Sequence, residues 1–146
     1  MKKSKGAVAL EFLFLFPFVV AMLYAAATYG LLFFGKYEMQ GVVDQAASSA
    51  LRVDRNRVHE DALGEQVTTT ATAVLTEGAG RLSPAFREAI ESSGCVLSTV
   101  QGLELLRCSM TLNNTEAPVI PQMSFGLLGL FPPLPERLSV EASVAF

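Results

Sequence analysis

Residues 2–35 decide how this chain is organised: Lys2-Lys-Ser-Lys-Gly6, then Ala7-Val-Ala-Leu-Glu11-Phe12, then an apolar run that ends at Phe33-Phe34-Gly35. Between Ala7 and Gly35 the only formal charge is Glu11. Because a helix rises about 1.5 Å per residue, about 20 apolar residues cross the hydrocarbon core of a bilayer. The run is longer than that, so we predict a transmembrane helix over residues 7–35.

The lysines on either side of this run predict its orientation. Lys2, Lys3 and Lys5 precede it, whereas only Lys36 follows soon after it. Short cytoplasmic segments carry an excess of basic residues. We therefore expect a single-pass protein of the cytoplasmic (inner) membrane, with its N-terminus in the cytoplasm and everything after Gly35 in the periplasm.

Glu11 is the most informative residue of the run. A carboxylate costs about 2.5–3.5 kcal/mol at the centre of a membrane helix and less near the interface. Glu11 either sits at headgroup depth or has a dedicated cationic partner. If the chain were cut after Gly6, the new ammonium of Ala7 would lie at the positive end of a helix, about one turn from Glu11. In an assembly, Glu11 of one subunit could neutralise the amine of the next.

These residues resemble a known processing site. Lys5-Gly6, followed by Glu11 and the aromatic Phe12, resembles the cleavage motif of type IV prepilins, and more closely that of the Flp/Tad branch. The continuation, with Pro17, Tyr29-Gly30 and Gln45-Ala-Ala-Ser-Ser-Ala-Leu-Arg52, resembles the TadE-like family. The resemblance covers about the first third of the chain. Ala7 replaces the phenylalanine that usually follows the cut in type IV pilins.

The resemblance implies a role in the tight-adherence (Tad) pilus system. TadE-like proteins are minor pseudopilins, so cleavage between Gly6 and Ala7 by a prepilin peptidase is expected, with Glu11 and Phe12 serving assembly. The implied partners are this peptidase, other minor pseudopilins, the major pilin and the inner-membrane assembly platform. Whether the protein enters the filament, caps it or stays in the membrane is left open.

Two other interpretations of the N-terminal run remain. It could be a secretory signal cut at Ala25-Ala-Ala27, although signal peptides have apolar regions of about 7–15 residues and this one is longer and contains Glu11. It could also be an uncut anchor for a membrane-tethered periplasmic binding or adaptor module. The mass of the N-terminus separates these alternatives from the pseudopilin.

The charge of the chain argues against nucleic acid as a partner. The net charge is −3, and removing Lys2, Lys3 and Lys5 with the leader leaves 8 of the 11 basic residues against 14 acidic ones. Binding to phosphates needs clustered lysine and arginine. We therefore expect neither a nucleic-acid partner nor electrostatic docking onto anionic lipid.

Helices are expected to continue beyond the membrane. An amphipathic stripe predicts a helical stalk extension over residues 36–56, formed by Val42, Val43, Ala46, Ala47, Ala50 and Leu51. A second helix is predicted from Val58 to Glu77 with Gly78 as its C-cap. A third starts with Ser83 as N-cap and Pro84 at its first position, and ends at Gly94.

The two cysteines belong to a predicted hairpin. Cys95–Val100 and Leu103–Leu112 flank Gln101-Gly102, which suits a two-residue turn. Pairing Val100 with Leu103 places Cys95 opposite Cys108 at a non-hydrogen-bonded site, where Cα atoms approach to about 4.5 Å. This separation suits a disulfide, and the periplasm would allow it to form.

Two C-terminal segments complete the head. Residues 117–135 are rich in proline, glycine and apolar residues, and are either a loop folded over the sheet or a contact surface for a partner. Residues 137–146 alternate, with Leu138, Val140, Ala142, Val144 and Phe146 on one side, which predicts a half-buried strand.

No pattern points to catalysis. His59 is the only histidine and lies in a charged segment, and two cysteines cannot supply a structural zinc set. We expect no enzyme activity, no catalytic residue, no metal and no cofactor. The expected fold is α+β: a leader (1–6), a transmembrane helix (7–35), a stalk extension (36–56), and a small head (57–146) of one or two helices and a short antiparallel sheet.

Overall fold

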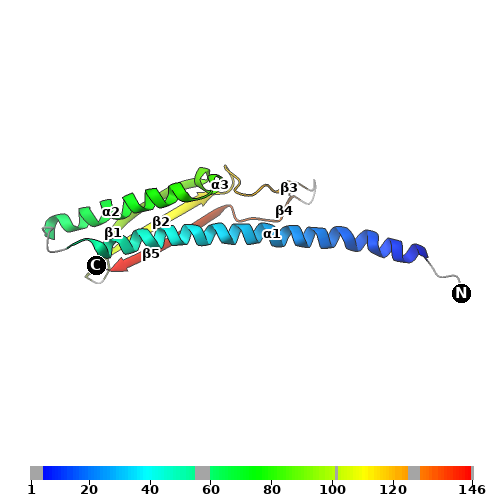
Figure 1. Cartoon of the computed structure of the whole chain (residues 1–146), viewed down its shortest axis with the longest axis horizontal. Coiled ribbons are helices and arrows are strands. Elements are labelled where there is room, and N and C mark those ends of the chain that lie inside the picture. The colour runs from blue at the N-terminus through cyan, green and yellow to red at the C-terminus, as the bar shows by residue number, and fades with distance from the viewer. Residues whose placement is uncertain (1–4, 55–59, 101, 125–128, 146) are drawn as a thin grey trace.

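One long helix carries a small α+β head, as predicted. The computed structural model describes residues 5–54, 60–100, 102–124 and 129–145, with backbone alone for 5–8 and 60–61. Helix α1 spans Lys5–Ser49 without a break at Pro17, and the 3-10 turn η1 follows at Ala50–Arg52. Figure 1 shows that α1 runs the length of the molecule and that the head lies along only part of it. Helical structure thus ends slightly before the expected boundary at residue 56.

Helix α2, Glu60–Arg81, lies alongside α1 and is longer than expected. The prediction that Gly78 ends this helix is wrong, because Gly78 is buried inside it. A Cβ atom at Gly78 would come within 2.6 Å of Cγ1 of Val42 on α1. This glycine therefore permits two helices to approach closely.

The short helix α3, Pro84–Glu88, starts where the sequence predicts. The N–H of Arg87 donates to the carbonyl of Ser83 at 3.0 Å. The expected end at Gly94 is wrong, because the chain enters strand β1 (Ile90–Val100) directly. Pairing with β2 supplies hydrogen-bond partners that a longer helix would have provided from within. Phe86 packs on Gly35, where an added Cβ would lie 1.9 Å from the ring.

The main sheet has three antiparallel strands in the order β1-β2-β5. Strand β2 spans Leu103–Asn113 and β5 spans Arg137–Ala145. The predicted register is confirmed, with Val100 opposite Leu103 and Cys95 opposite Cys108. The two cysteines are joined by a disulfide, with their Cα atoms 4.0 Å apart. Gly102 has a φ of +82°, which suits the turn, and Gln101 lies outside the described residues.

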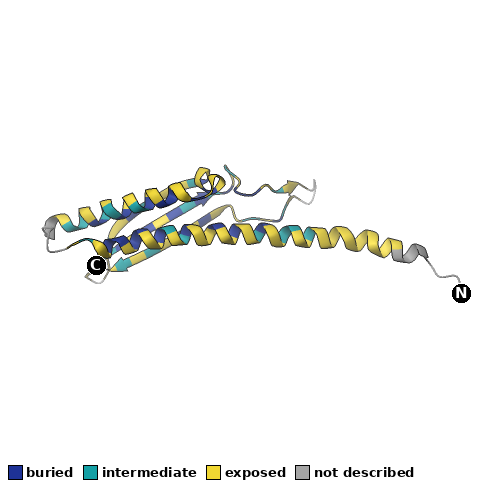
Figure 2. Cartoon of the chain, in the orientation of Figure 1, coloured by how far each residue is buried: buried dark blue, intermediate teal, exposed yellow. Residues whose placement is uncertain are grey.

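The core lies between one face of this sheet and helices α1 and α2 (Figures 1 and 2). Side chains alternate along a strand, so β2 directs every second residue to the helices. Buried core residues include Leu106, Cys108, Met110 and Leu112 of β2, Leu138 and Val140 of β5, Met39, Val43, Ala46 and Ala47 of α1, and Val67, Ala71 and Leu75 of α2. Strand β5 is half-buried as predicted, although Phe146 lies outside the described residues. Leu51 departs from the predicted stripe because it is exposed.

The described residues of the segment 117–135 lie beside α1, where neither interpretation of the sequence placed them. Val119 and Ile120 are buried at the end of the core. Further along, β3 (Met123–Ser124) pairs with β4 (Leu130–Phe131), while residues 125–128 lie outside the described part. The hydroxyl of Tyr24 donates to the Pro121 carbonyl at 2.8 Å, and that of Tyr29 to the Pro133 carbonyl at 2.7 Å. Two tyrosines of α1 therefore anchor this segment.

Candidate functional site: the exposed end of the long helix

The two ends of α1 have different surroundings. Every residue from Ala9 to Val20 is exposed, although nearly all of them are apolar. Burial begins at Thr28 and then recurs every three or four residues, at Leu32, Gly35, Met39, Val43 and Ala46. Figure 2 shows this change along the helix. The exposed apolar end must meet a bilayer or other protein chains, because water disfavours so large an apolar surface.

Glu11 and Phe12 lie on this exposed end. The rings of Phe12 and Phe16 stack with centroids 5.7 Å apart. Glu11, Phe12, Phe14, Leu15 and Phe18 line a shallow, open hollow on the helix surface. Among the described residues, Glu11 forms no ion pair. An open apolar hollow with one carboxylate suits the side chains of a neighbouring helix better than a small molecule, which is usually enclosed.

Gly6 and Ala7 lie in the first turn of α1, whereas residues 1–4 are outside the described part. Ala7 and Glu11 are four residues apart, so they share one helix face about a turn apart. A chain starting at Ala7 would carry its ammonium where the helix dipole is already positive. A carboxylate near that group, from its own chain or a neighbour, would stabilise it in an apolar environment.

Helix α1 also has the composition of a membrane span. Within the described part of the chain it is the one helix long and apolar enough to cross a bilayer. Its apolar end is uncovered by the head, unlike the buried core helix of a soluble protein. The helix therefore fits a single-pass membrane protein.

Comparison with known families supports this description. A family model described as TadE-like protein matches residues 6–48. The N-terminal third of this chain is TadE-like. The matched segment starts at the predicted cleavage site and ends one residue before α1 does, so it covers the long helix and leaves out the head. The TadE-like segment associates the protein with the Tad pilus system. No curated protein and no solved structure matches the chain.

Asn114 is a structural residue that sequence analysis missed. Its buried amide donates to the Pro135 carbonyl at 3.2 Å and accepts from the N–H of Val119 at 2.9 Å. Its own N–H donates to the Glu136 carbonyl at 2.8 Å. Asn114 thus ties both ends of the 117–135 segment to the end of β2. An asparagine before a proline-rich stretch is a known signal for a side-chain-stabilised turn.

The other residues considered for catalysis or metal binding form no such site among the described residues. His59 lies outside the described residues. Within the described ones, His, Cys, Asp and Glu side chains form no group of three or more that could hold a metal ion. The disulfide lies on the helix-facing side of the sheet, where Cys108 is fully buried. Its position makes it part of the head's core.

Proposed function

We propose that this TadE-like protein is a minor pseudopilin that takes part in assembling a tight-adherence type IV pilus. One observation carries the proposal: the TadE-like helix presents an apolar, uncovered end that contains a single carboxylate, Glu11. An anchor alone would need no charge at this position, since an ionisable residue within a span is costly. An assembly surface that receives the amine of a neighbouring subunit does need one.

In this proposal the chain begins as a precursor in the cytoplasmic membrane with its head in the periplasm. A prepilin peptidase removes residues 1–6, which carry three lysines. The amine of Ala7 then faces Glu11 of an adjacent subunit, either another minor pseudopilin or the major pilin, while the inner-membrane platform holds the growing assembly. The protein itself catalyses no reaction, because the cleavage chemistry belongs to the peptidase.

The intact mass of the protein recovered from its native host tests the proposal. We expect a chain that starts at Ala7. A chain that retains Met1 would support the uncut adaptor instead, and a start at Thr28 would support a secretory signal. Either result would overturn the proposed function.

Two glycine variants sharpen this test. Gly6→Leu should remain uncut, because the residue before the cut has changed. Gly30→Ala is the matched control on the same helix, where an added Cβ meets nothing within 4 Å. It should be cut like the wild type. Equal cleavage of both variants would show that Gly6 does not define the processing site.

A further inference from the structure

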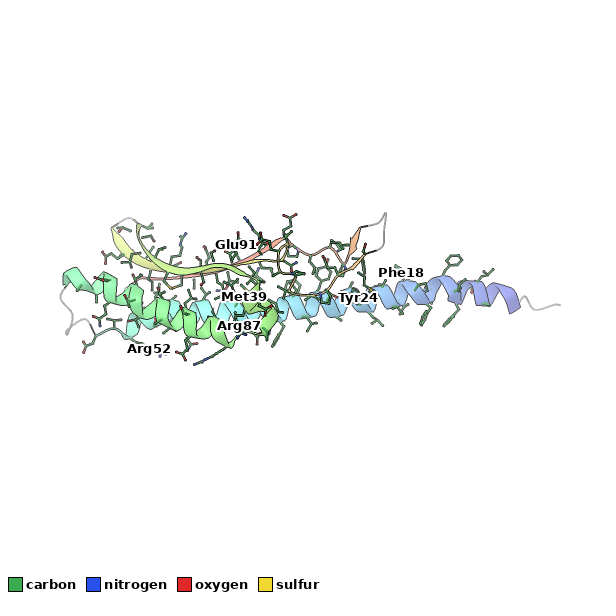
Figure 3. All side chains as sticks on the ribbon, turned by 90° about the horizontal axis from the view of Figure 1, so that it is seen from above. Phe18, Tyr24, Met39, Arg52, Arg87 and Glu91 are labelled. Atoms are coloured by element: carbon green, nitrogen blue, oxygen red, sulfur yellow. A yellow bond between two sulfur atoms is a disulfide. The ribbon has the colours of Figure 1, made fainter. Side chains whose placement is uncertain are left out.

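The paired strands β3 and β4 form an apolar tip that lies against the part of α1 expected in the membrane. We define this tip by its described residues Met123, Ser124, Leu130 and Phe131. Met123 and Phe131 face a depression whose other walls are Phe16, Pro17, Val20, Ala21 and Tyr24 of α1. Figures 1 and 3 show β3 and β4 beside this stretch of helix, with Tyr24 at its level and Phe18 further toward the N-terminus. We propose that the tip inserts among the lipid acyl chains of the bilayer, and this inference rests on the proposed membrane insertion of α1.

The depth of the tip follows from the length of the apolar run. About 20 helical residues span a bilayer core. The apolar run, in which Glu11 is the only charged side chain, extends from 7 to 35. Every stretch of that length within 7–35 contains residues 16–26. The helix residues that line the depression together with the tip, Phe16 to Tyr24, therefore lie within the span in every placement. A tip that stays docked on them must itself enter the bilayer.

The surface of the tip suits lipid better than water. Residues 117–135 contain no charged residue, although Glu116 and Glu136 flank them directly. Met123 is 44% exposed and Leu130 is 58% exposed, so apolar side chains point outward as well as toward α1. A flap that only shielded the helix from water would present polar side chains on its outer face.

Several backbone polar groups of this segment have hydrogen-bond partners within the protein, as an apolar environment requires. Each unsatisfied backbone polar group is costly in the hydrocarbon region, so a non-helical segment there needs hydrogen-bond partners within the protein. Five of the seven prolines of the chain lie between 117 and 135, and a proline has no N–H to leave unsatisfied. The carbonyls of three of them, Pro121, Pro132 and Pro133, accept hydrogen bonds from Tyr24, Gln122 and Tyr29 respectively.

The tyrosines that supply two of these bonds also indicate depth. Tyrosine is enriched at membrane–water interfaces, where its ring sits in the apolar region and its hydroxyl meets polar groups. Tyr29, nearer the head, holds the segment at Pro133, and Tyr24, at the level of the tip, holds it at Pro121. The tip extends from there toward Phe16 and thus toward the bilayer interior.

The absence of tryptophan from the chain permits a direct test. Single-tryptophan variants of the full chain are purified in detergent and reconstituted, without partner proteins, into phosphatidylcholine vesicles with brominated acyl chains. Leu130→Trp reports on the tip, and Met123→Trp is a second reporter in case the first perturbs the hairpin. Phe18→Trp reports on insertion of α1. Leu103→Trp, at the start of β2 and the opposite end of the head, is the water-exposed control.

We expect the bromolipid to quench most of the emission of the tip reporters and of Phe18→Trp, but little of that of Leu103→Trp. Quenching of Phe18→Trp without quenching of either tip reporter would overturn this inference and leave the membrane insertion intact. That result would instead indicate that the tip stays outside the bilayer, where a neighbouring subunit could bind it. Failure to quench Phe18→Trp would overturn both the inference and the membrane placement of α1.

Discussion

The two ends of α1 belong to one continuous helix, yet they are apolar in different ways. From Ala9 to Val20 the helix is apolar on all sides and fully exposed. From Thr28 to Ala47 one stripe is buried against the head, while the exposed faces carry Leu31, Phe33 and Phe34 at first and then charged residues such as Lys36, Glu38 and Asp44. A helix that is apolar all round needs an apolar environment, whereas a striped one needs a core on one side only. The difference locates the head on one end and the membrane or assembly surface on the other.

The carboxylates of α1 repeat this contrast. Glu38 and Asp44 lie on the water-facing side of the head, where a charge is expected. Glu11 is the one acidic residue of the all-apolar end. Water solvates Glu38 and Asp44, so these two carboxylates need no partner, whereas the proposed function gives Glu11 one in the amine of a neighbouring subunit.

Replacing a methionine by alanine at each end of α1 should give the largest difference in the stability of the head. Met39→Ala removes a fully buried side chain from the head-covered end of α1, and such truncations cost about 2–5 kcal/mol of unfolding free energy. Met22→Ala removes the same atoms from the exposed end of α1 and should leave the stability of the head essentially unchanged. Amide hydrogen exchange along β2, measured on both variants in detergent, checks this. Equal destabilisation would contradict the division of α1 into two environments.

The disulfide should stabilise the head and have no influence on the exposed helix. Closing a loop of the length between Cys95 and Cys108 is worth about 3 kcal/mol in the chain-entropy model. The double variant Cys95→Ser, Cys108→Ser should therefore speed exchange in β1 and β2 while α1 still inserts into vesicles. Thiol labelling of the wild type from the periplasm should find no reactive cysteine. Two reactive thiols there would argue against the predicted topology.

A smaller effect is expected at Asn114, which ties the segment 117–135 to the end of β2. Asn114→Ala deprives the buried N–H of Val119 of its acceptor, which costs about 1–3 kcal/mol. Exchange at Val119 should accelerate more than exchange within β2. Asn113→Ala is a neighbouring control, because the Asn113 side chain accepts only from the exposed turn at Thr115 and Glu116. A larger effect at Asn113 than at Asn114 would remove Asn114 from the anchoring role.

Local sequence patterns predicted the parts of the fold that depend on neighbours in sequence. The apolar run predicts α1, and the turn Gln101-Gly102 sets the pairing that brings Cys95 opposite Cys108. The alternation after Arg137 predicts β5. Each of these follows from a period or a count along the chain, which tertiary contacts then reinforce.

Contacts between distant segments explain what the sequence did not reveal. Gly78 suggested a helix end, but its role depends on Val42, far away in sequence. Gly94 suggested a stop, but pairing of β1 with β2 decides the structure there. The docking of residues 117–135 depends on hydroxyls of Tyr24 and Tyr29, which no local pattern relates to the prolines that they bind. Of the candidate site, sequence identified Glu11 and Phe12, but only the structure shows that the head leaves them uncovered.

In the proposed function, Glu11 neutralises the amine of a neighbouring subunit. Glu11→Gln keeps the size of the side chain and removes its charge, leaving that amine without a partner in an apolar environment. Losing one partner of a buried pair costs about 3–5 kcal/mol, whereas an exposed pair is worth about 0–1 kcal/mol. Glu38→Gln is the matched control, since it makes the same change on the exposed face of the same helix.

Co-purification with the pilin-like partners, combined with N-terminal mass, measures this directly. We expect Glu11→Gln to be inserted and cut before Ala7, but to bind its partners at least about a hundredfold more weakly than the wild type, as a buried-pair loss implies. Glu38→Gln should be recovered normally. A Glu11→Gln protein that is cut, co-purifies with its partners and supports pilus formation like the wild type would contradict the account and leave Glu11 as a carboxylate at the membrane surface.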